Sequence, residues 1–420
     1  MGMTITEKIL AKASGLKSVS PGEIVWVDID LAITDDLALP LFITFEQDIK
    51  AERVWDPNKI LIVFDHLIPA TTEKAADIQV KLREFCYKHS VHFYEIGHPG
   101  HGIMTLVGYE QGFARPGMVV VGNDSHTPIL GALGLFSTGI GFTEMAIVFA
   151  TGKIWFKVPS SLKVNLMGQL GQRIMTKDVI LKIIADIGTT GALYKALEFS
   201  GPGLEKISLD GRMTMSCMAC EAGAKTAIMA PDEHVLKDVR RRTIEPFFVF
   251  KSDIGAKYEK EYEYDLNNIV PMVAVPPNVD DVRPACELKG IKIDQAFLGS
   301  CTNAKAEDLK VAAEILRGNQ VHPKTRMVIT PVSQQVYKYA LEQGWIKIFM
   351  EAGAVITNPT CGACLGGHAG LLGKGEICAS SGNRNWAGRM GSKEAYIYMM
   401  SPATVAASAI KGEICDPRDI

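Results

Sequence analysis

The stretch IDQAFLGSCTNAKAEDLKVAAEILRG, residues 293–318, carries the pattern from which we predict the fold. An apolar run typical of a buried β-strand is followed by a polar loop that contains Cys301, and a helix-forming segment follows the loop. Similar pairs of a short apolar run and a helical segment recur along the chain. This alternation predicts an α/β fold with mostly parallel sheets.

The predicted strands and helices are spread over the whole chain. The predicted strands are residues 23–30, 59–66, 117–124, 163–168, 293–300 and 326–331, and the predicted helices are residues 71–90, 176–188, 304–318 and 333–345. In the runs KILIVFDH and IDQAFLGS, polar residues come at the carboxyl end. Because open α/β sheets bind ligands at that end, we expect the functional site there.

The length of 420 residues and two changes in composition predict three α/β domains around a central cleft. The string KVPSS, residues 157–161, separates a glycine-rich first part from a new strand–helix unit. A charged and then proline-rich segment that ends near Gly290 predicts a linker. We expect domains at residues 1–157, 158–285 and 286–420.

Composition excludes several classes of function. A formal net charge of −3 gives no electrostatic footprint for nucleic acid or for an anionic membrane. The sequence contains no apolar run of the roughly 18 residues that a membrane-spanning helix needs. Its N-terminus lacks the apolar core and cleavage site of a signal peptide. Nine cysteines are too few, and odd in number, for a disulfide framework, so we expect a reducing, cytoplasmic location.

Three cysteines stand out as candidate metal ligands. Cys301 follows a strand run, and Cys361 and Cys364 form a C-x-x-C pair in NPTCGACLGG, residues 358–367. Three thiolates suit three corners of a four-iron cluster and leave one iron open to a substrate. We expect Cys301 at the N-terminus of the following helix, where the helix dipole favours a thiolate. Glycines flanking the pair predict a loop that wraps closely around the metal centre.

Other interpretations of the cysteines remain open. A C-x-x-C pair alone is also typical of a redox site or of half a zinc site. A second pair, Cys217 and Cys220, raises the alternative of a four-cysteine zinc site, which would leave Cys301 without a role. The remaining cysteines are predicted to be small buried hydrophobic residues: Cys86, Cys286, Cys378 and Cys415.

Five motifs in order resemble the aconitase superfamily, and within it the large subunits of 3-isopropylmalate dehydratase and homoaconitase. They are DHLIPA (65–70), DSHT (124–127), LGSCTN (298–303), NPTCGACLGG (358–367) and SGNRNWAGRMG (381–391). The resemblance covers essentially the whole chain. It implies a [4Fe-4S] cluster with one iron that no cysteine binds, and the removal of water from a hydroxy-acid or its addition back.

The resemblance also implies roles for individual residues. The cluster ligands correspond to Cys301, Cys361 and Cys364. The segment that contacts the cluster and the substrate carboxylate corresponds to Asn383, Arg384 and Arg389. The catalytic positions are a pair that helps the hydroxyl leave, a second acid/base strand end, and a carboxylate beside the cluster: Asp65 and His66; Asp124 and His126; and Glu221.

These roles agree with the chemistry of the residue types. Loss of water requires a Lewis acid and a proton donor, so that the hydroxyl leaves as water. An adjacent aspartate fixes the tautomer of a histidine and supports its charged form. Arginine offers a planar fork that fits a carboxylate.

At three places the chain departs from the family pattern. Thr105 stands where the family has a histidine in a GI-x-H stretch, and Cys217 stands where it has an asparagine. Asp35–Asp36 replaces the early His–Asp pair of many relatives. Either the substrate is a divergent hydroxy-acid, or the usual chemistry is impaired. The retained cysteines, Asp–His sites and arginines favour the first explanation.

The resemblance further implies a partner and a substrate class. Single-chain aconitases end in a mobile fourth domain, and isopropylmalate-type enzymes supply it as a separate small subunit, which we expect here because the chain lacks that swivel domain. The predicted function is a hydro-lyase or isomerase for a malate-type hydroxy-acid, 3-isopropylmalate by resemblance. The alternatives are homocitrate or homoaconitate, a 2-methyl- or 2,3-dimethylmalate or a less usual substrate, and a cluster-based RNA-binding iron sensor.

Overall fold

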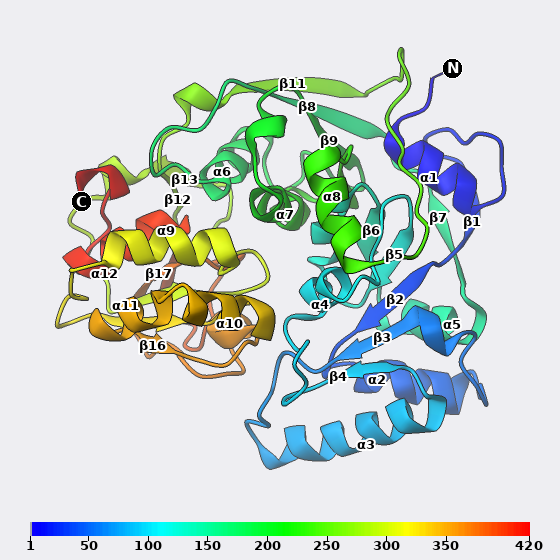
Figure 1. Ribbon diagram of the computed structural model, residues 1–420, viewed down its shortest axis with the longest axis horizontal. Helices are drawn as coiled ribbons and strands as arrows, with labels where there is room; N and C mark the ends of the chain where they lie inside the picture. Colours follow the sequence, from blue (N-terminus) through cyan, green and yellow to red (C-terminus); the bar gives the residue numbers. More distant parts are fainter. Residues whose placement is uncertain (1) are drawn as a thin grey trace.

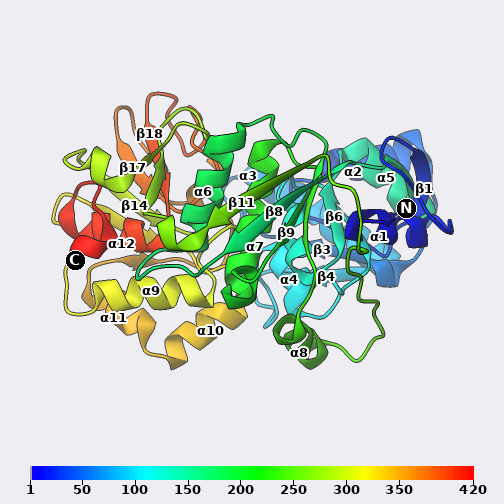
Figure 2. The ribbon, with the colours of Figure 1, turned by 90° about the horizontal axis from the view of Figure 1, so that it is seen from above.

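The computed structural model describes residues 2–420, which form four β-sheets with helices packed against them (Figure 1). In Figure 1 the blue and cyan part of the chain lies at the right and reaches the bottom, the green part lies at the top, and the yellow to red part at the left. Figure 2 shows the green part lying between the other two. The three larger sheets belong to these three parts of the chain. The α/β fold with mostly parallel sheets is confirmed.

The first large sheet is parallel throughout, in the order β4-β3-β2-β5-β6. Its strands are β2 (Leu31–Thr34), β3 (Ile60–Val63), β4 (His92–Tyr94), β5 (Val119–Gly122) and β6 (Phe136–Gly139). Its helices are α2 (Leu39–Ile43), α3 (Glu73–His89), α4 (Met104–Glu110) and α5 (Phe142–Thr151).

Alternation along β3 explains why both faces of this sheet are covered. Leu61 and Val63 join a core that includes Leu106 of α4, whereas Ile60 and Ile62 join the core that contains aromatic residues of α2, α3 and α5. Successive side chains of a strand point to opposite faces, so a wholly apolar strand needs a layer on each side.

A two-stranded antiparallel sheet, β1 (Ile24–Asp28) with β7 (Lys153–Lys157), leads to the second large sheet. That sheet is parallel in the order β10-β9-β8-β11. Its strands are β8 (Ser161–Met167), β9 (Ala196–Ser200), β10 (Thr226–Met229) and β11 (Lys260–Asp265). Its helices are α6 (Thr176–Ile187), α7 (Leu209–Met218) and α8 (Glu233–Arg242). Helix α1 (Ile5–Ala13) begins the chain with a capping box at Thr4.

The third large sheet is mixed, in the order β13-β12-β18-β17-β14-β15-β16. Its strands are β12 (Met272–Ala274), β13 (Val282–Pro284), β14 (Gln295–Leu298), β15 (Arg326–Ile329), β16 (Val355–Ile356), β17 (Ile377–Ser380) and β18 (Tyr396–Met400). Its helices are α9 (Ala306–Leu316), α10 (Gln334–Glu342), α11 (Trp345–Glu351) and α12 (Pro402–Lys411). Strand β12 pairs antiparallel with β13 and β18. Strands β12 and β13 therefore belong to this sheet, although both precede the domain boundary expected at residue 285.

Two local predictions need correction. The helix expected over residues 333–345 is interrupted at Gly344, which has a φ of 76° and separates α10 from α11. Cys301 does not lie at a helix N-terminus, because α9 begins only at Ala306. Ser300 and Ala304 have left-handed φ angles of 80° and 75°, so the chain turns twice before the helix starts.

The first and third sheets meet where their parallel strands end. The backbone N–H of Cys361 donates to the carbonyl of Asp65 at 2.9 Å, and that of Gln334 donates to the carbonyl of His101 at 2.8 Å. The first bond joins the loop after β3 to the loop after β16, and the second joins the segment after β4 to the start of α10. Polar residues of both sheets are therefore brought to one place. No helix among residues 2–420 is long and apolar enough to cross a membrane.

Candidate active site

Two of the three expected cluster cysteines are buried and one is partly buried, all in loops at the carboxyl ends of strands in the third sheet. Cys301 follows β14, Cys361 precedes the short 3-10 helix η8 (Gly362–Leu365), and Cys364 lies within it. The side chain of Asn383 contacts two of them: its Nδ2 donates to Cys301 Sγ at 3.3 Å, and its Oδ1 accepts from Cys364 Sγ at 3.1 Å. Arg389 Nη2 lies 3.8 Å from Cys364 Sγ. The structure therefore gathers the predicted cluster ligands with two residues of the SGNRNWAGRMG motif.

Gly362 allows the C-x-x-C loop to approach the sheet. Its φ is 58°, and a Cβ placed on it would lie 2.9 Å from Thr330 Oγ1 and 3.0 Å from the ring of Phe297. A side chain here would be strained and would clash, so glycine is required for this loop path.

The donors fit an iron–sulfur cluster better than a four-cysteine zinc site. Burial raises the pKa of the Cys361 thiol, so metal binding must supply the energy that deprotonates it. The two additional cysteines point to different partners. Cys217 Sγ lies 3.8 Å from Cys301 Sγ, whereas Cys220 Sγ donates to Glu221 Oε1 at 3.4 Å. The two C-x-x-C pairs thus do not converge as a zinc site would require.

The remaining cysteines are mostly as predicted. Cys86, Cys378 and Cys415 are buried, but Cys286 is exposed. The expectation for Cys286 is wrong because it lies in a short 3-10 helix, Ala285–Leu288, whose buried positions are Ala285 and Leu288.

Asp65 and His66 form a close pair at the end of β3. His66 Nδ1 lies 2.7 Å from Asp65 Oδ1 and 3.6 Å from Asp35 Oδ2. The carboxylate of Asp36 accepts hydrogen bonds from the backbone N–H groups of Asp65 at 3.0 Å, His66 at 2.8 Å and Leu67 at 2.8 Å. Asp36 therefore holds the loop that carries the pair, and Asp35 faces the imidazole.

The charges around His66 favour its protonated form. Burial alone would lower the pKa of His66, but the neighbouring Cys361, Asp65 and Asp35 raise that pKa well above its usual value. Burial, together with the charges of Asp65 and Asp36, raises the pKa of Asp35 to about 7, although His66 opposes this effect. The site thus contains a cationic histidine and a carboxyl group that titrates near neutral pH.

A second histidine network lies at the end of β5. The backbone N–H of His126 donates to Asp124 Oδ1 at 2.6 Å, and His126 Nε2 lies 3.0 Å from Glu221 Oε1. Glu221 belongs to the 3-10 helix η5 (Ala219–Ala222), and it also accepts a hydrogen bond from Arg384 Nε at 2.8 Å. These contacts bring residues of all three large sheets together, as the motifs predicted.

Interactions within this network lower the pKa of its two carboxyl groups and raise the pKa of its histidine. Burial would raise the pKa of Asp124 and of Glu221, but hydrogen bonds and charge from His126 lower both values, and Arg384 contributes at Glu221. Burial would lower the pKa of His126, yet Cys220, Cys301 and Asp124 raise it well above its usual value. An ionised carboxylate therefore lies between two cationic side chains.

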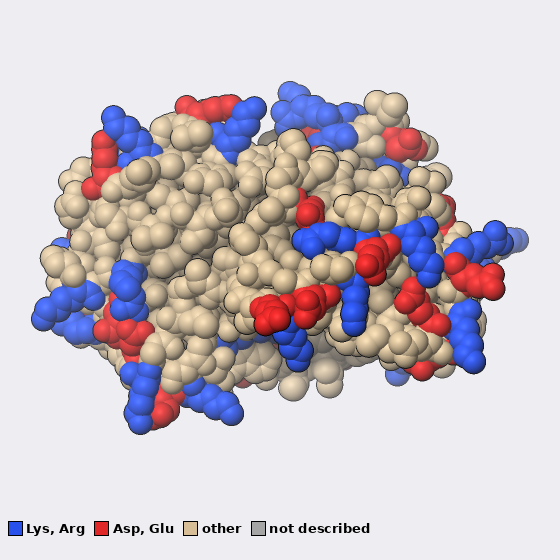
Figure 3. All heavy atoms as spheres, turned by 90° about the horizontal axis from the view of Figure 1, so that it is seen from below, with Lys and Arg blue, Asp and Glu red and all other residues tan. Residues whose placement is uncertain are grey.

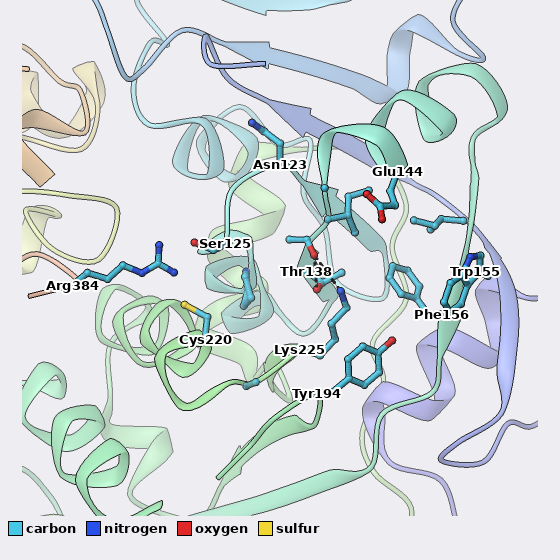
Figure 4. Close-up of a pocket in the computed structure, with 16 residues that line it drawn as sticks. Asn123, Ser125, Thr138, Glu144, Trp155, Phe156, Tyr194, Cys220, Lys225 and Arg384 are labelled. Carbon is cyan, nitrogen blue, oxygen red and sulfur yellow. Dashed lines mark hydrogen bonds between the residues drawn. The ribbon is translucent and has the colours of Figure 1, made fainter. Parts of the chain in front are cut away.

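A cavity of about 580 Å³ opens beside this network (Figure 4). Arg384, Cys220 and Ser125 line one end, and Trp155 and Tyr194 line the other. Its size suits a small organic molecule, and its polar end adjoins Glu221, the partner of both Arg384 and Cys220.

The three departures from the family pattern all lie at this site. The buried Thr105 follows Met104, whose backbone N–H donates to Asp65 Oδ2 at 2.7 Å. Thr105 Oγ1 has no hydrogen-bond partner among residues 2–420. Cys217 and Asp35 contact Cys301 and His66, as described above.

Sequence reasoning missed two supporting residues. The buried Lys177 on α6 donates to the carbonyls of Ser381 at 3.1 Å and Gly382 at 2.6 Å, and so holds the loop that presents Asn383. Burial lowers the pKa of Lys177 to about 8. Cys220 reaches the His126 network directly. The helical pattern of residues 176–188 predicts α6, but a lysine within a helix carries no signal of this role.

Comparison with known proteins agrees with this geometry. The chain matches the family described as "Aconitase family (aconitate hydratase)" over residues 7–287 and 281–412. It is 49% identical to a probable 3-isopropylmalate dehydratase large subunit of Methanothermobacter thermautotrophicus, over 99% of each chain. It is 46% identical to a probable methanogen homoaconitase large subunit of the same organism, covering 99% of this chain and 98% of that one.

Two further comparisons concern a bacterial relative and a solved structure. A 3-isopropylmalate dehydratase large subunit of Aquifex aeolicus is 46% identical, covering 100% of this chain and 98% of that one. The crystal structure of Thermococcus kodakaraensis aconitase X aligns with a TM-score of 0.50 at 12% identity, over 85% of this chain and 84% of that one. That structure supports the fold alone, whereas the family match and the identities of nearly half establish descent. The chain belongs to the aconitase family.

Proposed function

We propose that this chain is the large, catalytic subunit of an iron–sulfur hydro-lyase that dehydrates and rehydrates a malate-type hydroxy-acid. The observation that carries the proposal is the convergence of three elements at the strand ends. They are a set of three thiols, a histidine that two carboxyl groups keep protonated, and an arginine held by a buried glutamate. Membership of the aconitase family agrees with a hydro-lyase.

Cys301, Cys361 and Cys364 would hold a [4Fe-4S] cluster, with Asn383 bonded to two of the sulfurs. When bound, the cluster supplies an iron without a cysteine ligand that acts as a Lewis acid toward the substrate hydroxyl and carboxylate. Arg389 lies beside Cys364, so its charge opposes that of an anionic cluster.

The protein's own residues supply proton transfer and binding. His66, held in its charged form by Asp65, donates a proton at Nε2 to the departing hydroxyl and takes it back in the reverse direction. Asp124 orients His126, and the pair of His126 and Glu221 provides a second acid/base position. Arg384 offers its free guanidinium nitrogens to a substrate carboxylate, while Nε stays on Glu221.

The relatives narrow the substrate to a class. Their names include both 3-isopropylmalate dehydratase and homoaconitase, at 49% and 46% identity. We take 3-isopropylmalate as the first substrate to test because that name belongs to most of the similar chains reported above. Homocitrate or homoaconitate and other 2- or 3-substituted malates remain in the same class, because Thr105, Cys217 and Asp35 change contacts at the site.

A separate small subunit is the expected partner, since the relatives are named large subunits. The cavity beside Arg384 is open, and a second polypeptide would close it and exclude water. Figure 3 shows basic and acidic side chains interspersed around one face with a wide uncharged area between them, which suits a protein partner better than nucleic acid. A reducing cytoplasm suits the thiolate ligands.

We also propose three structural domains, one around each large sheet. The first boundary lies near residue 157, between β7 and β8. Because β12 and β13 pair within the third sheet, the second boundary fits best between β11 and β12, ahead of the proline-rich segment.

The test is anaerobic reconstitution of the chain with iron and sulfide, with and without its small subunit. Activity would be measured on a panel of substituted malates by the ultraviolet absorbance of the unsaturated product. We expect turnover only when cluster and small subunit are both present. Full turnover by the cluster-free protein would contradict the proposal, as would the absence of turnover of every malate by the loaded complex.

A further inference from the structure

A set of three different donor groups lies outside the cluster cysteines. His126, Cys220 and Glu221 each offer one ligand atom, and these atoms all lie within 4.8 Å of one another. Glu221 Oε1 lies 3.0 Å from His126 Nε2 and 3.4 Å from Cys220 Sγ. Around a tetrahedral zinc ion the corresponding edges measure roughly 3.3 Å and 3.5 Å, given Zn–N and Zn–O bonds of about 2.0 Å and Zn–S bonds of about 2.3 Å. The two distances from Glu221 are therefore within a few tenths of an ångström of those in a zinc site, and the third pair lies within 4.8 Å.

We propose that His126, Cys220 and Glu221 form a second metal site, which binds a single Zn²⁺ ion and competes with catalysis. Nitrogen, sulfur and carboxylate oxygen together are the donor set of a zinc ion, and harder cations such as Mg²⁺ and Ca²⁺ do not select a thiolate. Three protein ligands leave a fourth position for water, and Cys220 lines a cavity from which water can reach it.

The backbone holds these donors in place. Cys220 and Glu221 are consecutive in η5, and Cys220 Sγ also lies 3.2 Å from the carbonyl of Cys217. His126 comes immediately before the 3-10 helix η3 (Thr127–Leu133), which packs closely against α7, the helix that leads into η5. Little rearrangement is needed to bring the three groups onto one ion.

Zinc binding does not add net positive charge beside Arg384, whose Nε lies 2.8 Å from Glu221 Oε1. Binding forms a Zn–S, a Zn–N and a Zn–O bond, and it releases to solvent the proton of the Cys220 thiol and one proton of the His126 imidazolium. Two positive charges are thereby exchanged for two protons, so the net charge of the site does not change. Arg384 then neighbours a zinc-bound carboxylate instead of a free one.

The site is distinct from the other group of three donors, Asp65, His66 and Cys361. That group shares Cys361 with the cluster, whereas none of His126, Cys220 and Glu221 is a proposed cluster ligand. Zinc at the second site would remove His126 and Glu221 from the proposed proton transfer. It would therefore inhibit an enzyme that still holds its cluster.

The test is equilibrium dialysis of the cluster-loaded protein against buffered free Zn²⁺, with metal analysis of the protein. We expect about one zinc ion per chain. Cys220→Ser should weaken its binding at least tenfold, and Cys286→Ser, at an exposed cysteine, should leave it unchanged. Absence of zinc binding would overturn the proposal, as would zinc binding that Cys220→Ser does not affect.

A second measurement does not depend on the cluster. In the cluster-free protein with Cys301, Cys361 and Cys364 all replaced by serine, added Co²⁺ should give the intense near-ultraviolet band of a cobalt–thiolate bond. Cys220→Ser in that background should abolish the band, and persistence of the band would contradict the assignment. Neither readout requires turnover, so failure of the zinc site and failure of the proposed reaction can be distinguished.

Discussion

Replacing Asp36 by asparagine should destabilise the protein strongly, because one carboxylate holds three backbone N–H groups of the loop that carries Asp65 and His66. An asparagine oxygen at the Oδ1 position keeps the bonds to Asp65 and His66, but each becomes a neutral bond and loses about 1 kcal/mol. The N–H of Leu67 then faces an amide NH₂ and stays unsatisfied, which costs about 1 to 3 kcal/mol. We therefore expect Asp36→Asn to lower the free energy of unfolding by about 3 to 5 kcal/mol.

The adjacent residue offers a matched control. Asp35 accepts a single backbone hydrogen bond, from Leu37 at 2.9 Å, which an asparagine oxygen can also accept. Its pKa of about 7 means that half of its population is already neutral at that pH. Asp35→Asn should therefore not lower the free energy of unfolding at pH 7 by more than about 1 kcal/mol, and it can raise it, because the wild-type carboxyl loses stability as it ionises.

The assay is urea unfolding of the cluster-free protein at pH 7, followed by far-ultraviolet circular dichroism. Midpoints and slopes give the free energy of unfolding for the wild type and both variants. A loss below about 1 kcal/mol for Asp36→Asn, or equal losses for the two variants, would refute the reasoning.

Three further predictions concern pH, substrate binding and the cluster. The pKa of Asp35 in the folded protein lies above the ordinary value of 3.8, so the stability that neutral Asp35 contributes is lost as the pH rises toward 7. Asp35→Asn should therefore show a smaller fall in the free energy of unfolding between pH 4 and 7 than the wild type, and an equal fall would contradict this. Arg384→Lys should raise the KM of the reconstituted enzyme at least tenfold, because an ammonium cannot replace the guanidinium fork, whereas the exposed Arg326→Lys should not change KM. Cys217→Asn should raise the reduction potential of the reconstituted cluster by adding an N–H donor beside Cys301, and a redox titration that shows no rise would count against that contact.

Much of the fold could be predicted from the sequence. Buried parallel strands are continuous apolar runs, and β3, β5, β14 and β15 all lie within the predicted ranges. Short or weakly patterned strands gave no comparable signal, and β4 and β16 were missed. The turn between β14 and α9 was also missed, because serine and alanine do not favour the left-handed conformations that Ser300 and Ala304 adopt.

The residues of the candidate site that lie within the sequence motifs could be predicted, and those outside the motifs could not. Asp65, His66, Glu221 and Arg384 occur in short strings whose spacing is fixed by strand ends and tight turns, and the structure brings them together. Lys177 was not predictable, because its importance depends on which carbonyl groups lie opposite a helix that is distant in sequence. Such contacts between distant segments follow from packing and leave no local pattern.

The central claim is that three cysteines hold an iron–sulfur cluster at this site. Iron and sulfide analysis with electron paramagnetic resonance, on protein reconstituted without oxygen, tests it most directly. We predict about four iron and four sulfide atoms per chain. This content should fall sharply in each of Cys301→Ser, Cys361→Ser and Cys364→Ser, and should be unchanged in Cys86→Ser, a buried cysteine outside the site. A full cluster in any of the three ligand variants, or mononuclear zinc in place of iron in the wild type, would contradict the account.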